Sequence, residues 1–521
     1  MSRNPSISAR GIVLSIILGL NTTVLASAIF ISPDWLWFFA GTLPLLFLAV
    51  YNLRQNTHTI LKNFPLLGYG RYFFESIRPE LRQYFGESDL GGRPFNRRQR
   101  SVVYQRAKNV RQTVAFGMLE DPEKPGHDWV AHSVYPVNIE DKDLRVIIGN
   151  KQCRKPYSAS ILNVGAMSYG ALSKTAISAL NEGAVIGGFA HNTGEGGISD
   201  YHLRGGDLIW QIGTGYFGCR DSEGRFWPEL YKKNAARESV KMIELKLSQG
   251  AKPGHGGILP GDKNTSEIAV IRNVKPGTTV YSPPAHSAFS NSMEMVGFIR
   301  QLRQLSGGKP VGFKICIGDK SEFEDICNAI NITGILPDFI TIDGSEGGTG
   351  AAPLEFTDNI GMPLYEALSF ASQTLKKFGL QDHIKLIAAG KIITAFDILK
   401  ALSLGATACY SARGMMFSLG CIQALTCDSN RCPVGIATQN PSLYSGLDIT
   451  EKRVRVANFH RNTMKATVEM MEACGFKSIT DIHPGKFFRK IDPLQTKSFQ
   501  DIYFSEADER LSERNFQAMA N

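Results

Sequence analysis

Eight short apolar runs recur between residues 158 and 415, and each run ends in glycine or polar residues before a helical stretch. The runs occupy residues 161–164, 187–190, 242–247, 278–281, 311–315, 339–342, 385–388 and 406–410. Strand and helix patterns that alternate in this way predict parallel strands joined by crossover helices. Eight such units within about 250 residues predict an α/β fold, the closed (β/α)8 TIM barrel.

Glycine-rich segments follow several of these runs, at the strand ends where such a barrel carries its active site. Residues 343–351 read DGSEGGTGA, and Gly390-Lys391 and Ala412-Arg413 follow the last two runs. Glycine lets backbone N–H groups approach an anion, and barrel phosphate sites are usually built after the last two strands. The pattern predicts a phosphate-bearing cofactor, with tight turns that bind nothing as the alternative.

Lys314 lies inside the apolar run 311–315. A lysine in an apolar strand is costly unless it faces the barrel mouth and meets a partner. Lys252 and Arg272 are further candidates for contact with an anion or a flavin. Lys252 lies in a glycine and proline loop, where a solvated side chain is the simpler interpretation.

Three of the nine cysteines, Cys421, Cys427 and Cys432, are spaced C-x5-C-x4-C and are followed by Pro433. Nine cysteines in a chain of this length do not indicate a disulfide framework. Zinc would need a fourth ligand, and no obvious histidine lies nearby. Three thiolates suit an iron–sulfur cluster with a vacant corner, and three unrelated buried thiols are the alternative.

The N-terminal region carries only one charged residue, Asp34, between Arg10 and Arg54. The apolar runs 11–32 and 35–51 on either side approach the roughly 20 residues that cross a bilayer. We expect a transmembrane helical hairpin within residues 1–53; a signal peptide and a buried core hairpin are the alternatives. Basic residues outside both runs predict that the two ends, and the catalytic domain, lie on the cytoplasmic side of the inner membrane.

The rest of the chain divides into a basic and aromatic juxtamembrane segment (54–135), a barrel domain (136–480) with a cysteine loop at 419–441, and a polar C-terminal tail (481–521). A hydrophobic content of 43% excludes a wholly disordered chain. A net charge of +9 over 521 residues is too dilute to indicate nucleic-acid binding.

Seven segments between residues 130 and 475 together resemble the flavin-binding synthase domain of glutamate synthases. They are NVGAMSYGALS at 163–173, HNTGEGG at 191–197, QIGTGYFG at 211–218, QGAKPGHGG at 249–257, SPPAHS at 282–287, DGSEGGTGAAP at 343–353 and LGCIQALTCDSNRCPVGIATQNP at 419–441. The resemblance implies a β/α barrel that holds FMN beside a 3Fe–4S cluster. In that family, electrons pass from the cluster to FMN, and a hydride then reduces 2-iminoglutarate to glutamate.

The resemblance also implies roles for individual residues. It assigns flavin contacts to Gly165, Ala166, Met167, Ser168, Asn192, Gln211 and Lys314, and phosphate contacts to Gly348, Thr349, Gly350, Gly390, Ala412 and Arg413. It assigns the substrate to Met167, Ser168, Glu195, Lys252 and Arg272, and catalysis to Lys314, Glu195 and Lys252. It makes Cys421, Cys427 and Cys432 the cluster ligands.

The sequence departs from the family at several of these segments. The family's substrate loop reads K-P-G-E-G-G-Q-L-P-G, whereas this chain has His255 for Glu and Ile258 for Gln. Tyr216 replaces a flavin-side Arg. Losing a polar side chain beside a dicarboxylate changes what a pocket can pair with. We also expect no glutaminase domain in this chain.

We therefore expect a membrane-anchored FMN and 3Fe–4S oxidoreductase that acts on CH–NH2 donors, passing electrons to or from a small amino, keto or imino acid, with 2-oxoglutarate to glutamate as one reaction. An N-methylglutamate-synthase-type amination subunit is one alternative, and a non-catalytic membrane scaffold or redox sensor is another. The expected partners are an electron donor protein or membrane electron carrier, a separate ammonia-supplying subunit and membrane lipid, but not nucleic acid.

Overall fold

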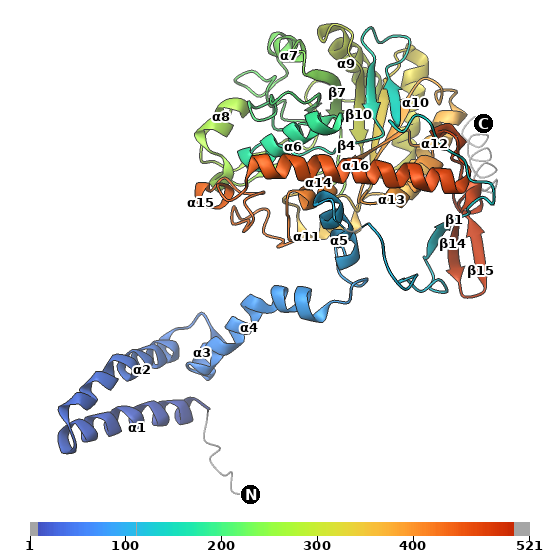
Figure 1. The fold of residues 1–521 in the computed structure, drawn as a ribbon. Helices are drawn as coiled ribbons and strands as arrows, with labels where there is room; N and C mark the ends of the chain where they lie inside the picture. The colour runs from blue at the N-terminus through green and yellow to red at the C-terminus, as the bar shows by residue number, and fades with distance from the viewer. Residues whose placement is uncertain (1–8, 111, 505–521) are drawn as a thin grey trace, which may run out of the picture. The chain divides into compact units, whose positions relative to one another are not determined.

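Figure 1 shows the fold in a computed structural model, which describes residues 9–110 and 112–504. The chain divides into two compact units, Met1–Pro94 and Phe95–Asn521. The second unit therefore takes in much of the expected juxtamembrane segment. Residues 1–8 of the expected hairpin region and residues 505–521 of the expected tail lie outside the described residues.

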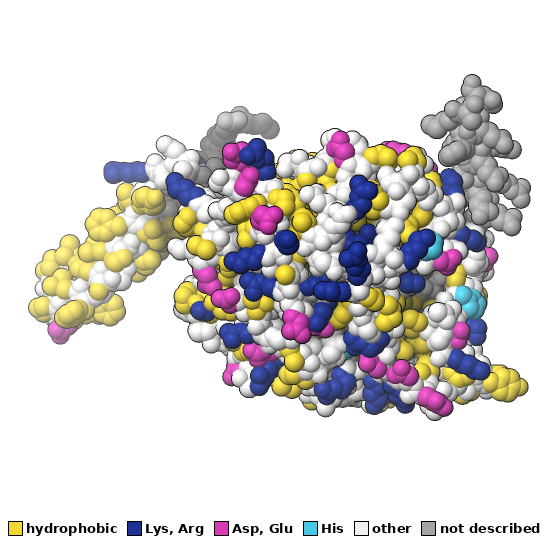
Figure 2. Space-filling view, turned by 90° about the horizontal axis from the view of Figure 1, so that it is seen from above, with side chains coloured by type: hydrophobic (Ala, Val, Ile, Leu, Met, Phe, Trp, Pro, Cys, Tyr) yellow, Lys and Arg dark blue, Asp and Glu magenta, His cyan; other side chains and the backbone are white. Residues whose placement is uncertain are grey.

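The first unit begins with two apolar helices, α1 (Ala9–Phe30) and α2 (Phe39–Arg54), joined by the 3-10 helix η1 (Pro33–Phe38). By length and composition both segments can cross a membrane, and only 17% and 11% of their apolar windows are buried. A core helix of a soluble protein is mostly buried, so this exposed apolar surface (Figure 2) argues against a buried core hairpin. Thr42 Oγ1 donates to Asn21 Oδ1 at 3.0 Å and links the two helices.

Short helices follow the candidate hairpin within the first unit. They are α3 (Thr59–Asn63), α4 (Leu67–Leu81) and the π-helix η2 (Arg82–Gly86).

The second unit is built around a closed barrel of eight parallel strands. In order they are β4 (Leu162–Val164), β5 (His191–Asn192), β6 (Leu208–Ile212), β7 (Val240–Lys246), β10 (Val311–Ile315), β11 (Phe339–Asp343), β12 (Lys385–Ala389) and β13 (Ala408–Ser411). β13 pairs with β4 and closes the ring. The predicted barrel class is confirmed.

Helices surround the strands, and their bounds follow the chain. They are α5 (Arg97–Ala107), α6 (Lys174–Gly187), α7 (Pro228–Ala235), α8 (Ser266–Arg272), α9 (Ser292–Leu305), α10 (Lys320–Thr333), α11 (Leu354–Asn359), α12 (Leu364–Lys377), α13 (Ala395–Ser403), α14 (Arg413–Ser418), α15 (Pro441–Tyr444) and α16 (Ile449–Cys474). The long helix α16 packs along α6 and α5 (Figure 1).

Two of the eight predicted strands were wrong. The run 278–281 ends in β9 (Val280–Tyr281), which pairs antiparallel with β8 (Ile258–Leu259) in a small hairpin outside the barrel. The missing barrel strand is β6, whose five residues are all buried. The run 187–190 also begins too early, because Gly188 at φ 68° is the left-handed cap that ends α6.

Part of the segment expected as a polar tail is folded. β14 (Phe487–Asp492) lies between β1 (Asp128–Val130) and β15 (Gln495–Ser498), and α17 (Phe499–Tyr503) follows. Arg489 Nε lies 2.7 Å from Asp128 Oδ1, and Lys400 of α13 lies 3.2 Å from Asp128 Oδ2. These charges tie the sheet to the barrel helices. A separate hairpin joins β2 (Arg145–Ile148) to β3 (Tyr157–Ser160).

Candidate active site

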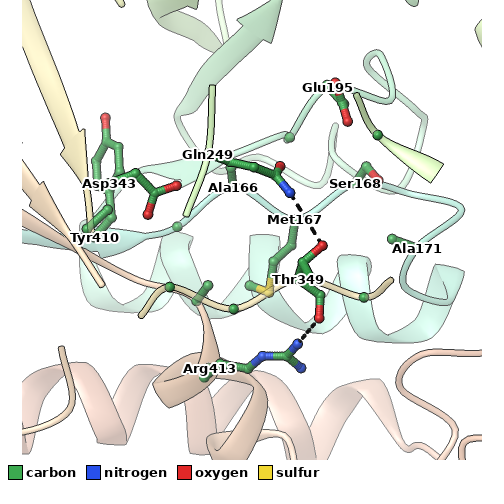
Figure 3. A pocket seen from close by; sticks show the side chains of 18 of the residues that line it. Ala166, Met167, Ser168, Ala171, Glu195, Gln249, Asp343, Thr349, Tyr410 and Arg413 are labelled. Atoms are coloured by element: carbon green, nitrogen blue, oxygen red, sulfur yellow. Dashed lines mark hydrogen bonds between the residues drawn. The ribbon is translucent and has the colours of Figure 1, made fainter. Parts of the chain in front are cut away.

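A cavity lies at the C-terminal ends of the barrel strands, and residues following seven of the eight strands, or at their ends, line it together with Gln211 of β6 (Figure 3). The predicted residues that line it are Gly165, Ala166, Met167, Ser168, Glu195, Gln211, Lys252, Arg272, Lys314, Gly348, Thr349, Gly350, Gly390, Ala412, Arg413 and Cys427. Barrel closure therefore brings together residues that lie up to 262 positions apart (Gly165 to Cys427). This is the location that the fold predicts for an active site.

Asn192 is the exception among the predicted flavin contacts. It is fully buried and does not line the cavity. Its Nδ2 donates to Glu244 Oε1 at 2.8 Å, while its Oδ1 accepts from the Gly194 N–H at 3.0 Å. Because both ends of the amide are engaged within the protein, we assign Asn192 to holding Glu244 and not to the flavin ring.

Glu244 of β7 is a buried acid beneath the cavity. Its Oε1 accepts from Asn192 and, at 2.7 Å, from Gln211 Nε2, and its Oε2 accepts from Thr341 Oγ1 at 2.7 Å. Three strands thus supply donors to one fully buried carboxyl group. Such a network fixes the orientation of Gln211, which does line the cavity.

Two lysines on neighbouring strands carry the charge at the base of the cavity. Lys314 of β10 lies beside Lys246 of β7 in the sheet register. Lys314 Nζ lies 3.2 Å from Asp343 Oδ2, and Lys246 Nζ lies 3.0 Å from Glu195 Oε1. Burial opposes the charge on Lys314, but Asp343 and Glu244 outweigh it and raise the pKa of Lys314 above its ordinary value. Lys314 therefore stays positive in a buried position.

Glu195 and Arg272 each keep one buried polar atom without a hydrogen-bond partner among the described residues, Oε2 and Nε respectively. Arg272 Nη2 donates to Ser168 Oγ at 3.3 Å and to the Tyr169 carbonyl at 3.2 Å. Burial opposes the charge on Glu195, yet Lys246 and Arg272 lower its pKa. A carboxylate-bearing ligand would satisfy the unused guanidinium donor.

The cavity also contains a cradle of small residues built from the loops after β4, β11, β12 and β13. A side chain at Gly165 would lie 3.1 Å from the Ala412 Cβ, and one at Gly348 would lie 2.7 Å from Arg413 Nε. Thr349 lies between Gln249 and Arg413, with Gln249 Nε2 donating to Thr349 Oγ1 at 3.4 Å (Figure 3). Close backbone approach and a guanidinium fit a phosphate group.

The cysteine loop borders the cradle. Cys427 lines the cavity, and its Sγ lies 3.8 Å from Arg413 Nη1. Burial, and then the nearby Cys427 and Cys432, raise the pKa of the Cys421 thiol to about 11. The three thiols are close enough to interact, but within residues 9–110 and 112–504 no three His, Cys, Asp or Glu side chains converge as a metal site. Ligation by these cysteines stays a prediction.

The family comparison gives the kinship of the chain. Residues 103–477, well over half of the chain, match the family described as the conserved region in glutamate synthase. The chain belongs to the glutamate synthase family.

Relatives from this family cover different shares of their own length. The glutamate synthase large subunit-like protein YerD of Bacillus subtilis is 38% identical over 467 residues, which is 82% of this chain and 88% of that protein. The archaeal NADPH glutamate synthase of Methanocaldococcus jannaschii is 35% identical over 321 residues, which is 61% of this chain and 60% of the enzyme. Among solved structures, a mandelate oxidase aligns at 15% identity over 71% of this chain and 86% of that chain, with a TM-score of 0.42.

Sequence reasoning missed four charged or polar residues of this glutamate synthase family site: Glu244, Lys246, Asp343 and Gln249. Glu244 and Lys246 stand in the same apolar run, 242–247. The argument that singled out Lys314, the cost of a charge within a buried strand, applies equally to both of them. That signal was present in the sequence and would have found them.

Proposed function

We propose that this glutamate synthase family member is an FMN-dependent oxidoreductase that exchanges electrons with a 3Fe–4S cluster and acts on a small amino or keto acid. One observation carries the proposal: a glycine cradle with Arg413 opens into the same cavity as the buried, charge-paired Lys314 and Lys246. A phosphate and an electron-accepting ring are both stabilised by positive charge, so one phosphorylated redox cofactor matches this arrangement.

Bound FMN would supply hydride transfer at its ring system. The phosphate would be held by the cradle, which comprises Gly348, Thr349, Gly350, Gly390, Ala412 and Arg413. Gly165, Ala166, Met167, Ser168 and Gln211 would lie along the ring. Lys314 would hold a positive charge beside it, in a buried position where that charge acts strongly.

The substrate would be a carboxylate, because Lys252, Arg272 and Lys246 face one acid, Glu195, in this part of the cavity. Reduction of an imine to an amine needs a hydride and a proton, and Glu195, beside Lys246, is the group that we propose holds the proton. The proposed reaction is 2-oxoglutarate to glutamate, with ammonia from a separate subunit and electrons from a donor protein or membrane carrier. Ile258, which lines the cavity, favours as second candidate a less polar amine such as methylamine.

The visible absorption spectrum of the anaerobically purified full chain tests both cofactors. We expect released FMN, identified by chromatography, together with a broad iron–sulfur band. Cys427→Ala should lose that band and its iron, because the remaining two cysteines cannot hold a three-ligand cluster, whereas Cys327→Ala, at a buried thiol outside the loop, should keep both. A protein that binds neither FMN nor iron would contradict the proposal.

We also propose that the candidate hairpin anchors the protein in the cytoplasmic membrane. Deleting residues 1–53 should move the protein from the membrane pellet to the soluble fraction while it retains flavin. The expectation rests on the exposed apolar surface of α1 and α2. A truncated protein that still sediments with membranes, at high salt as well, would contradict the anchor.

Binding of the acid should depend on pH through Lys252. Burial, and then Lys246, lower the pKa of Lys252 to about 8. The ammonium is therefore present below about pH 8 and is lost above it, so affinity for 2-oxoglutarate should fall as pH rises from 7 to 9. Titrating the flavin absorbance with 2-oxoglutarate measures this affinity. Lys252→Met should bind about tenfold more weakly at pH 7 and lack the change; the same pH profile in both proteins would refute this role.

A further inference from the structure

Phe95 enters the cavity from outside the matched family region, 103–477. It is the first residue of the second unit, yet it is only 4% exposed. Its ring packs edge-on against Phe417 of α14 at 5.3 Å between centroids, and Lys391 Nζ lies 5.9 Å from its centroid. Because Lys391 and the start of α14 border the glycine cradle, Phe95 forms the wall of the cavity at that point.

The backbone of Phe95 is bound to the cysteine loop by a reciprocal pair of hydrogen bonds. The Phe95 N–H donates to Gln423 Oε1 at 3.2 Å, and Gln423 Nε2 donates to the Phe95 carbonyl at 3.1 Å. Gln423 has φ 59° and Leu425 has φ 57°, so the loop adopts a left-handed backbone at two non-glycine residues. Such a conformation persists only where surrounding contacts hold it.

Tyr104 of α5 supplies a second attachment. Its Oη donates to the Cys421 carbonyl at 2.5 Å, and its ring lies edge-on to Phe417 at 6.1 Å. The helix is itself fixed at its end, because Asn458 and Asn462 of α16 donate to the carbonyls of Ala107 and Arg106 at 3.2 and 2.9 Å. A rigid helix anchored on α16 thus holds the loop that carries the three cysteines.

We propose that residues 95–107 form a strap whose Phe95 and Tyr104 are positioning residues for the cysteine loop and for the phosphate end of the cavity. The part that concerns flavin rests on the proposed function. The strap is also the stretch of chain that directly continues the first unit. The segment that leaves the candidate anchor therefore forms part of the cofactor site.

Flavin release tests the cavity wall in the full-length protein. Phe95→Ala should raise the FMN dissociation rate at least about tenfold, which corresponds to about 1.4 kcal/mol, because the ring that covers the cradle is removed. Phe323→Ala is the matched control, since Phe323 is fully buried on α10 and does not line the cavity. Phe95→Leu should restore most of the retention. Equal release from Phe95→Ala and Phe323→Ala would overturn the role of Phe95.

Thiol reactivity tests the attachment to the loop without flavin. In full-length protein stripped of iron by a chelator, Tyr104→Phe and Gln423→Ala should each raise the alkylation rate of Cys421 and Cys427 by iodoacetamide at least about fivefold, followed by peptide mass spectrometry. Cys153, half-buried and outside the loop, is the internal control and should keep its rate. Unchanged rates at Cys421 and Cys427 would overturn the strap. A protein that never binds FMN would refute the proposed function, while this measurement would still decide the strap.

Discussion

Lys314→Met should slow substrate-dependent reoxidation of the reduced flavin by about 100- to 1000-fold, measured by stopped-flow absorbance. Methionine preserves the length and apolar stem of lysine but removes the buried charge at the base of the cavity. It also leaves Asp343, 3.2 Å from Lys314 Nζ, without that cation. Because a positive charge stabilises a reduced flavin that carries negative charge, the flavin reduction potential should also become more negative.

A second buried lysine serves as the control for this substitution. Lys309 Nζ donates to the carbonyls of Ala235 and Arg237 at 2.6 and 2.7 Å and does not line the cavity. Lys309→Met should therefore lower stability without changing the reoxidation rate or the potential. If Lys314→Met kept the rate and potential of the unmodified protein, Lys314 would have no role in the redox step.

Glu244→Leu should lower the free energy of unfolding by about 3–5 kcal/mol, the typical cost of removing one side of a buried charged network. The reason is that Asn192, Gln211 and Thr341 would all lose their common acceptor in the interior. Denaturant unfolding of the detergent-solubilised full chain, followed by tryptophan fluorescence, measures the loss. The reoriented Gln211 should also weaken flavin binding.

Glu244→Gln and Glu355→Leu bracket that result. Glutamine keeps one acceptor oxygen in nearly the same volume, so it should cost less than leucine. Glu355 lies exposed on α11, where substitution usually changes stability by less than about 0.5 kcal/mol. A loss at Glu244→Leu no larger than that at Glu355→Leu would show that the network does not stabilise the barrel.

The strand errors have a common physical cause. The run 278–281 is apolar and short, which is as typical of a small antiparallel hairpin as of a barrel strand, and its pairing with β8 is decided by contacts made at a distance. β6 was missed because Gln211 interrupts an otherwise apolar run, and that glutamine is accommodated only by Glu244 on the neighbouring strand. The folded part of the expected tail depends in the same way on Asp128, more than 300 residues earlier.

The sequence by itself determined the barrel class, the order of its glycine loops and the residue types in the cavity, because strand and helix periodicity and turn chemistry act over a few neighbouring residues. Only the tertiary structure decided which charges meet: Lys314 with Asp343, Lys246 with Glu195, and Phe95 with Gln423, which lie 328 residues apart. These contacts form when the barrel closes and its loops converge on one face. Their partners are therefore set by three-dimensional packing and not by any local pattern.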